Sequence, residues 1–273
     1  MRIAVVSDEI SEDFAEAVEL GTLLEIDTYE LRWVRPPGGL RHRRIGEISD
    51  DAAATLAATA RRHGVTISAL SPGLFHGRWD DLTLGYEFAR LDRSLHLAQI
   101  LGAKAIVVHG FRPPDDRRNG VCPPTVIEVL SEAASRAREA GCVLLLRNAP
   151  DSYADSGEHT ASIVHAVHSP ALAVSWDPCH AVRAGETAIR DGYEWVAPFV
   201  RDVRVKDQRC DEHGYEYTVL AEGMMDWIGQ LAALRRDGYQ GTATLGAQIE
   251  PRLLSTMQSL DALRKLMRAV RAA

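Results

Sequence analysis

The chain has 273 residues, of which 46% are hydrophobic and 25% are charged. This length suits one ordinary α/β domain and does not force two. The net charge of −7 and the lack of a basic stripe exclude a typical duplex-DNA binder, and no apolar run is long enough to cross a bilayer. Acidic residues appear by Asp8, too early for a secretory signal peptide, so we expect a cytoplasmic protein.

The four cysteines lie far apart in the sequence, at Cys122, Cys142, Cys179 and Cys210. None forms a CxxC pair, and their spacing suits neither a zinc site nor a disulfide framework. We therefore interpret them as reduced thiols.

Short strand-like stretches alternate along the chain with longer amphipathic stretches. The predicted strands, each with the helix that follows it, are Arg2–Ser7 with Asp13–Leu24, Thr28–Val34 with Asp50–His63, Val65–Ser71 with Leu84–Leu101, Lys104–His109 with Pro124–Ala140, Cys142–Arg147 with Glu158–His168, Leu172–Asp177 with Ala181–Ala197, Asp202–Lys206 with Met225–Asp237, and Gly241–Leu245 with Ser255–Ala272. Eight such repeats predict an α/β fold, a closed parallel (β/α)8 barrel that forms a single domain over residues 1–273.

The alternative with the same alternation is an open, doubly wound sheet. The count of eight repeats and the absence of a GxGxxG turn after the first strand favour the barrel. Glycines also separate several helices from the next strand, as expected for residues that end helices in the left-handed conformation. These are Gly64, Gly102, Gly141 and Gly238.

In a barrel of this kind the active site forms at the carboxyl ends of the strands and in the loops after them. Polar and charged residues gather at those ends, whereas the strand bodies stay apolar. The residues to inspect are Ser7, Asp8, Glu9, Arg32, Trp33, Ser71, His76, His109, Arg147, Asn148, Asp177, His180, Arg204, Lys206, Asp207 and Gly246.

Seven segments, spread over nearly the whole chain, carry a family resemblance by their order and spacing. They are Tyr29-Glu30-Leu31-Arg32-Trp33, residues 63–69, residues 97–103 leading into Val107-Val108-His109-Gly110, Trp176-Asp177-Pro178-Cys179-His180, residues 203–207, Ala221-Glu222-Gly223, and residues 238–241. Together they resemble the sugar phosphate isomerase/epimerase family of xylose-isomerase-like TIM barrels.

The resemblance implies one divalent metal with four ligands: a Glu ending the fifth strand, an Asp in an Asp-Pro-x-His motif, a His on the seventh strand and a Glu ending the eighth. The two glutamates would also form the acid/base pair. Here those positions hold Arg147, Asp177, Arg204 and Gly246, so three of the four ligands are missing. Arginine keeps its proton and has no lone pair to offer a metal. We therefore expect no metal at the family position and no other cofactor.

The candidates for acid/base catalysis are Asp177, His180 and His109, because histidine titrates near neutral pH and can act in either direction. Two alternatives stay open. Each histidine could be a structural residue bonded to a backbone carbonyl, or His76, His109, Asp177 and His180 could form a shifted metal site.

Arg147 and Arg204 are expected to replace the positive charge of the metal and to bind substrate. With Asp177 they carry a net charge of +1; the alternative is that one arginine simply neutralises Asp177. Lys206 would bind an anionic group, or else pair with Asp207. The remaining substrate-binding candidates lie on loops or at strand ends: His76, Trp79, Arg32 and Glu222. For Glu222, a solvated loop charge is the alternative.

The predicted function is a metal-independent, isomerase- or epimerase-like enzyme that moves a proton by acid/base catalysis in a small anionic or polyoxygenated substrate. One alternative is a lyase, dehydratase or cyclase in a specialised biosynthetic pathway. Another is a non-catalytic ligand-binding barrel. The expected partner is a small, anionic substrate, with no nucleic acid and no membrane, and the chain could form a homodimer.

Overall fold

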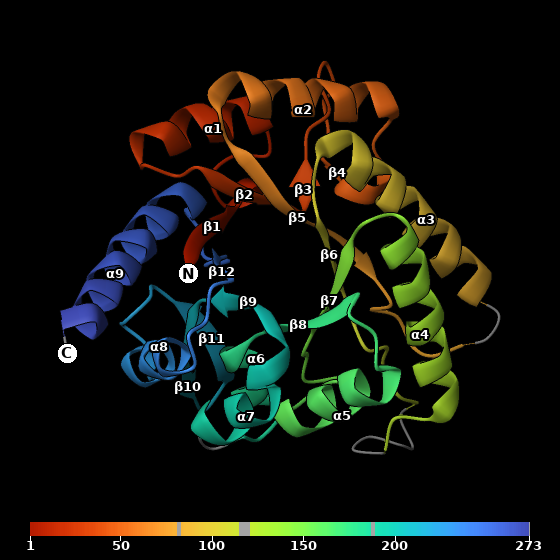
Figure 1. The fold of residues 1–273 in the computed structure, drawn as a ribbon. Coiled ribbons are helices and arrows are strands. Elements are labelled where there is room, and N and C mark those ends of the chain that lie inside the picture. The colour runs from red at the N-terminus through yellow and green to blue at the C-terminus, as the bar shows by residue number, and fades with distance from the viewer. Residues whose placement is uncertain (81–82, 115–120, 187–188, 273) are drawn as a thin grey trace.

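The computed structural model describes residues 1–80, 83–114, 121–186 and 189–272, and its centre is a closed barrel of eight parallel strands (Figure 1). The barrel strands are β1 (Arg2–Val6), β2 (Thr28–Leu31), β5 (Thr66–Leu74), β6 (Ala105–Val108), β7 (Val143–Arg147), β8 (Leu172–Trp176), β9 (Val200–Val205) and β12 (Thr242–Leu245). They follow one another around the barrel in chain order, and β12 closes on β1 with Arg2 beside Thr242. The predicted (β/α)8 fold is confirmed.

The helices form a ring outside the strands (Figure 1). They are α1 (Phe14–Leu23), α2 (Asp50–His63), α3 (Leu84–Leu101), α4 (Pro124–Glu139), α5 (Gly157–Val167), α6 (Pro178–Arg183), α7 (Ile189–Val196), α8 (Trp227–Arg236) and α9 (Arg252–Ala272). The single helix expected over Ala181–Ala197 is two helices here, and residues 187–188 between them lie outside the described chain. No helix in the ranges given above combines the length and apolarity that a membrane span requires.

Local sequence signals explain where several helices begin and end. The side chain of Asp13 accepts from the amides of Ala15 and Glu16 at the start of α1, and Ser49 caps α2 in the same way. Gly64 and Gly102 end α2 and α3 with φ of 67° and 73°, the left-handed conformation that glycine adopts without steric cost.

Alternation along the strands decides what fills the barrel. Ala69, Val107, Leu145 and Ala173 form a small apolar cluster inside it, separate from the large core between strands and helices. Side chains two residues apart share one face of a strand. His109, Arg147 and Ser175, each two residues beyond an interior apolar residue, are therefore the next to face the interior, and Asp177 follows two residues after Ser175. The polar carboxyl end of the barrel is therefore a direct consequence of strand register.

Two hairpins extend the carboxyl-end loops beyond the predicted repeats. The first pairs β3 (Trp33–Val34) with β4 (Arg43–Arg44), and the second pairs β10 (Asp207–Asp211) with β11 (Gly214–Thr218). The second hairpin follows β9 directly, so it stands beside the strand end that carries Lys206. Neither hairpin was predicted, because their strands are short or largely exposed and lack an aliphatic run.

Candidate functional site

Asp177 lies at the centre of the polar carboxyl end and is fully buried. It directly follows β8 and caps α6, where its Oδ1 accepts from the amide of His180 at 3.1 Å. The side chain of Asn148 fixes its backbone: Oδ1 of Asn148 accepts from the Asp177 amide at 2.7 Å, and Nδ2 donates to the Asp177 carbonyl at 2.9 Å. Asn148 therefore holds the strand end in register with β7.

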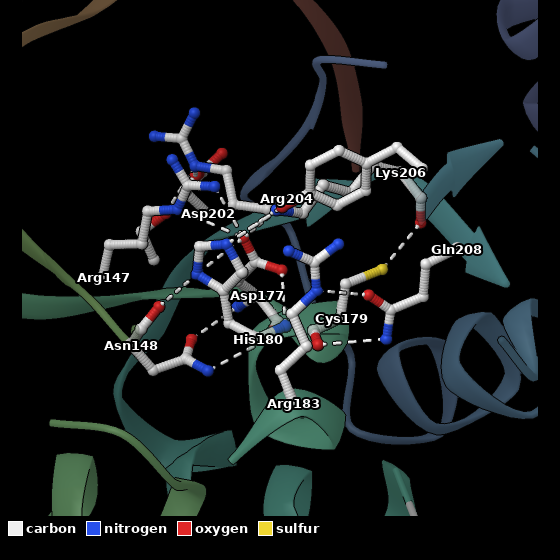
Figure 2. Close-up of polar contacts among 12 residues, drawn as sticks. Arg147, Asn148, Asp177, Cys179, His180, Arg183, Asp202, Arg204, Lys206 and Gln208 are labelled. Carbon is white, nitrogen blue, oxygen red and sulfur yellow. Dashed lines mark hydrogen bonds and ion pairs between the residues drawn. The ribbon is translucent and has the colours of Figure 1, made fainter. Parts of the chain in front are cut away.

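Two protein cations share the other carboxylate oxygen of Asp177 (Figure 2). Arg147 donates to Oδ2 from Nε at 3.2 Å and from Nη2 at 2.6 Å, and Nζ of Lys206 lies 3.0 Å from the same atom. Burial alone would raise the pKa of Asp177, but the adjacent His180, Lys206 and Arg147 outweigh it and hold that pKa far below its usual range. Asp177 is thus a permanent carboxylate.

His180 is neutral and fully engaged. Its Nδ1 donates to the carbonyl of Asn148 at 2.9 Å, which leaves Nε2 to accept from Nζ of Lys206 at 2.9 Å. Burial, opposed by Asp177 and reinforced by Lys206 and Arg147, lowers the pKa of His180 to about 3. The expected structural alternative for this histidine, a bond to a backbone carbonyl, is therefore present.

Arg204 belongs to a second buried cluster. Its Nη1 donates to Oε1 of Glu30 at 2.8 Å, its Nη2 lies 2.7 Å from Oε2 of Glu30, and its Nε lies 3.0 Å from Asp202. Ser175 bridges the pair, since it accepts from Nε of Arg204 and donates to Asp202. Burial opposes the charge on Arg204, but Glu30 and Asp202 raise its pKa above the usual value.

Glu30 and Asp202 also change the charge balance expected from the sequence. The three cations Arg147, Arg204 and Lys206 face three carboxylates, so the two clusters together are neutral rather than positive. The arginine that neutralises Asp177 is Arg147. Lys206 does not pair with Asp207, whose carboxylate accepts from backbone amides instead.

His109 lies two residues beyond the apolar interior position Val107 and is only partly buried. Its buried Nδ1 has no hydrogen-bond partner within the described residues. Burial and then the charge of Arg147 lower its pKa well below the usual value, so the ring is neutral. His76 is exposed as a whole residue and packs edge-on against His109, with ring centroids 4.7 Å apart. Partial desolvation of its ring and then the charge of Arg112 lower the pKa of His76 as well.

A small pocket lies between the two clusters, and its cavity volume is only about 10 Å³. It is lined by Val6, Glu30, Arg32, Arg147, Arg204, Val205, Lys206, Thr244, Gly246 and Gln248. Arg32 is held by Asp8 and Glu9, with Nη2 at 2.7 Å from each. For Arg147, Nη1 has no partner in the part of the chain that the structure describes.

The pocket lining omits three predicted substrate-binding residues, His76, Trp79 and Glu222, and all three acid/base candidates, His109, Asp177 and His180. Trp79 packs against Phe111, with ring centroids 5.1 Å apart, and joins the core at its edge. Glu222 is exposed and pairs with Arg209 at 3.5 Å, which matches the solvated alternative. The pocket instead includes Glu30, which had no predicted role.

The residues present do not fit the metal that the family resemblance implies. Within residues 1–80, 83–114, 121–186 and 189–272, no three His, Cys, Asp or Glu side chains converge on one point. A shifted site would need lone pairs of Asp177 and His180, but Lys206 and Arg147 already donate to these acceptors. A metal ion at this position would also be repelled by the positive charges of Arg147 and Lys206.

Comparison with known proteins places this geometry in context. The sequence pattern of the family described as xylose isomerase-like TIM barrel matches residues 14–266. A search of curated protein sequences gives no significant match.

Three solved structures illustrate the similarity. A xylose isomerase domain protein from Planctomyces limnophilus is 18% identical with a TM-score of 0.76, over 99% of this chain and 98% of that chain. The probable 3-DHS dehydratase AsbF from Bacillus anthracis is 12% identical with a TM-score of 0.79, over 97% and 99%. D-psicose 3-epimerase from Clostridium cellulolyticum H10 is 16% identical with a TM-score of 0.74, over 98% and 99%. At these identities the likeness shows the fold alone.

Proposed function

This chain belongs to the xylose isomerase-like TIM barrel family, and we propose that it is a metal-independent enzyme of the isomerase or epimerase type. Its reaction would move a proton next to a carbonyl in a small anionic or polyoxygenated substrate. The observation that carries the proposal is the pair of protein cations on Asp177, with Nη2 of Arg147 at 2.6 Å and Nζ of Lys206 at 3.0 Å. Fixed positive charge therefore stands where the resemblance implies a metal.

These cations would stabilise the charge that develops during the reaction. Removing a proton next to a carbonyl turns the carbonyl oxygen into an enolate oxyanion, and prearranged donors in a water-poor site lower the energy of that state. Two hydrogen bonds to Asp177 fix the guanidinium of Arg147, which also lines the pocket. In this proposal its free Nη1 edge faces the substrate oxygen.

His109 would carry the proton. A general base needs a lone pair at neutral pH, and the ring of His109 is neutral and only partly buried; because Nδ1 is buried, Nε2 is the nitrogen that would meet substrate. Asp177 is a poor base because its pKa is so low, and the nitrogens of His180 are both engaged. Asp177 and His180 would therefore orient Arg147 and Lys206 rather than exchange protons with substrate.

A dehydratase is the second candidate. Its reaction begins with the same proton removal and then expels a hydroxyl group from the neighbouring carbon. The likeness of the fold to the probable 3-DHS dehydratase AsbF makes this class worth testing alongside epimerases, and the same residues, His109 and Arg147, would serve it.

Hydrogen exchange into substrate tests both candidates at once. Chelator-treated protein is incubated in D₂O with a panel of small ketoses and hydroxy-keto acids, and the loss of C–H signals beside the carbonyl is followed by NMR. We expect exchange with at least one compound, insensitive to chelator and abolished in Arg147→Met and His109→Gln. His213→Gln, at an exposed hairpin turn, is the matched control. Exchange that requires added manganese or cobalt would contradict the proposal, and binding without exchange would favour a non-catalytic barrel.

A further inference from the structure

The β10–β11 hairpin brings one side chain back to the polar cluster. It leaves the barrel directly after Lys206 and returns in antiparallel register, with Gln208 opposite Tyr217 and Asp207 opposite Thr218. Tyr217 is therefore eleven residues from Lys206 along the chain but beside it in space. The hydroxyl of Tyr217 lies 2.8 Å from Nζ of Lys206 and 3.4 Å from Nε2 of His180.

The base of the hairpin is held by a buried carboxylate. Asp207 is fully buried and accepts from the amides of Gln208, Ala221, Gly223 and Met225, at 2.8 to 3.3 Å. A side chain at position 223 would meet the Asp207 carboxylate at 2.1 Å, so only glycine allows the loop to close this tightly. The hairpin thus starts from a fixed point.

Arg183 of α6 supports the ring of Tyr217 from outside. Its guanidinium lies 4.2 Å from the ring centroid of Tyr217 and 5.6 Å from that of Tyr215, and its Nε donates to Gln208 at 2.7 Å. A guanidinium stacked on an aromatic face is a stabilising arrangement. Two cations, Arg183 and Lys206, therefore lie against the ring of Tyr217.

Lys206 needs these contacts because its ammonium is almost entirely buried, with 2% of the side chain exposed. An ammonium has three protons to donate and no solvent here to accept them. Among the described residues, the three acceptors within 3.0 Å are Asp177 Oδ2, His180 Nε2 and Tyr217 Oη. The first follows β8, the second lies in α6, and the third belongs to the hairpin.

We propose that Tyr217 is a positioning residue for Lys206: its hydroxyl is the third acceptor that holds the ammonium in the cluster and keeps it from reacting as a free amine. This inference rests on the proposed function in one respect, the role of Lys206 as a fixed cation of the site. No contact between Tyr217 and substrate is required. Loss of the hydroxyl would leave one buried N–H without a partner.

The reactivity of the lysine amines tests this without any substrate. The chain has three lysines, Lys104, Lys206 and Lys265, and both others are exposed. The folded protein is labelled with a trace of acetic anhydride, and labelling at each lysine is read by peptide mass spectrometry. We expect Tyr217→Phe to raise labelling of Lys206 relative to Lys265 by about tenfold, since one hydrogen bond to a charged group is lost. Tyr215→Phe, the outer ring stacked on Arg183, is the matched control and should match wild type.

A second variant distinguishes the effect of the Tyr217 hydroxyl from simple covering of Lys206 by the Tyr217 ring. Arg183→Met removes the stacking partner but keeps the hydroxyl of Tyr217, so labelling of Lys206 should stay within about twofold of wild type. Unchanged labelling in Tyr217→Phe would overturn the proposal, and so would an equal rise in Arg183→Met. Because the readout is chemical labelling, a chain without any turnover would defeat the proposed function and still leave this result decisive.

Discussion

Replacing Arg204 with methionine should show that this residue stabilises the barrel. Arg204 is only 4% exposed and is the cation that faces Glu30 and Asp202, at 2.7 and 3.0 Å. The variant leaves Glu30, itself 1% exposed, as a buried carboxylate without a counter-charge. Breaking a buried ion pair from one side costs about 3–5 kcal/mol, and we expect a loss of that size in the free energy of unfolding.

The second carboxylate should contribute less to the loss. Asp202 keeps hydroxyl donors from Ser175, Thr242 and Thr244, so most of the cost falls on Glu30. The double variant Arg204→Met/Glu30→Gln buries no carboxylate without a partner at this position and should therefore be more stable than Arg204→Met alone.

Urea unfolding at pH 7, followed by circular dichroism, measures both effects. A loss below about 1 kcal/mol in Arg204→Met, under the range for breaking a buried pair, would refute the reasoning. A double variant no more stable than the single one would do the same. Arg236→Met is the matched control, because its pair with Asp237 is exposed and screened by solvent, so its loss should leave the free energy of unfolding nearly unchanged.

The other predictions concern pH, thiol chemistry and a surface charge. The pKa of His180 is lowered to about 3 in the folded protein, whereas an unfolded histidine titrates near its ordinary pKa of about 6.5. The unfolded chain therefore takes up a proton as pH falls and the folded chain does not, so the free energy of unfolding should decrease by about 2 kcal/mol between pH 7 and 5. His180→Gln should flatten this pH profile of urea unfolding. A thiol reagent at pH 8 should find one fast thiol, Cys210, which is exposed, and a second fast thiol would count against this. The other three, Cys122, Cys142 and Cys179, should react slowly, because burial raises the pKa of each thiol, to about 12 for Cys122, and only the thiolate form reacts. Glu222→Ala should change unfolding by less than about 0.5 kcal/mol, as expected at an exposed pair.

The barrel could be predicted because its signals are local. Aliphatic runs such as Val143–Arg147 and helix-ending glycines such as Gly64 and Gly102 each mark an element within a few residues. Eight repeats of that pattern leave few folds to choose from. The β10–β11 hairpin could not be predicted, because Asp207–Asp211 is polar and half exposed and has no periodic apolar pattern that would indicate a strand.

Some members of the site could be predicted, but Glu30, Asp202 and the pairing of the charges could not. Strand ends meet at one end of a barrel, which is why Arg147, Asp177 and Lys206 were expected together. Which arginine reaches which carboxylate depends on side-chain direction across the barrel: Arg204 pairs with Glu30, 174 residues away in sequence. Alternation by two along β9 and β2 was the available signal for Glu30 and Asp202.

The net charge of the site could not be predicted by adding the charges of Arg147, Arg204 and Asp177 alone, because other buried carboxylates lie beside them. Every one of these cations lies beside a carboxylate: Arg147 and Lys206 share Asp177, and Arg204 pairs with both Glu30 and Asp202. Buried charges are rarely left unpaired, since an isolated ion loses its hydration without compensation. Any cationic residue at a buried strand end therefore predicts a nearby acid, even when the sequence does not show which one.

The most direct test of the central claim is metal content. Protein purified without chelator is analysed for elements, and again after addition of manganese, cobalt or zinc followed by buffer exchange. We predict no metal near one equivalent per chain, because Lys206 and Arg147 already donate to Oδ2 of Asp177 and Lys206 to Nε2 of His180. One tightly bound metal per chain would contradict the account and require His109, Asp177 and His180 to rearrange around it.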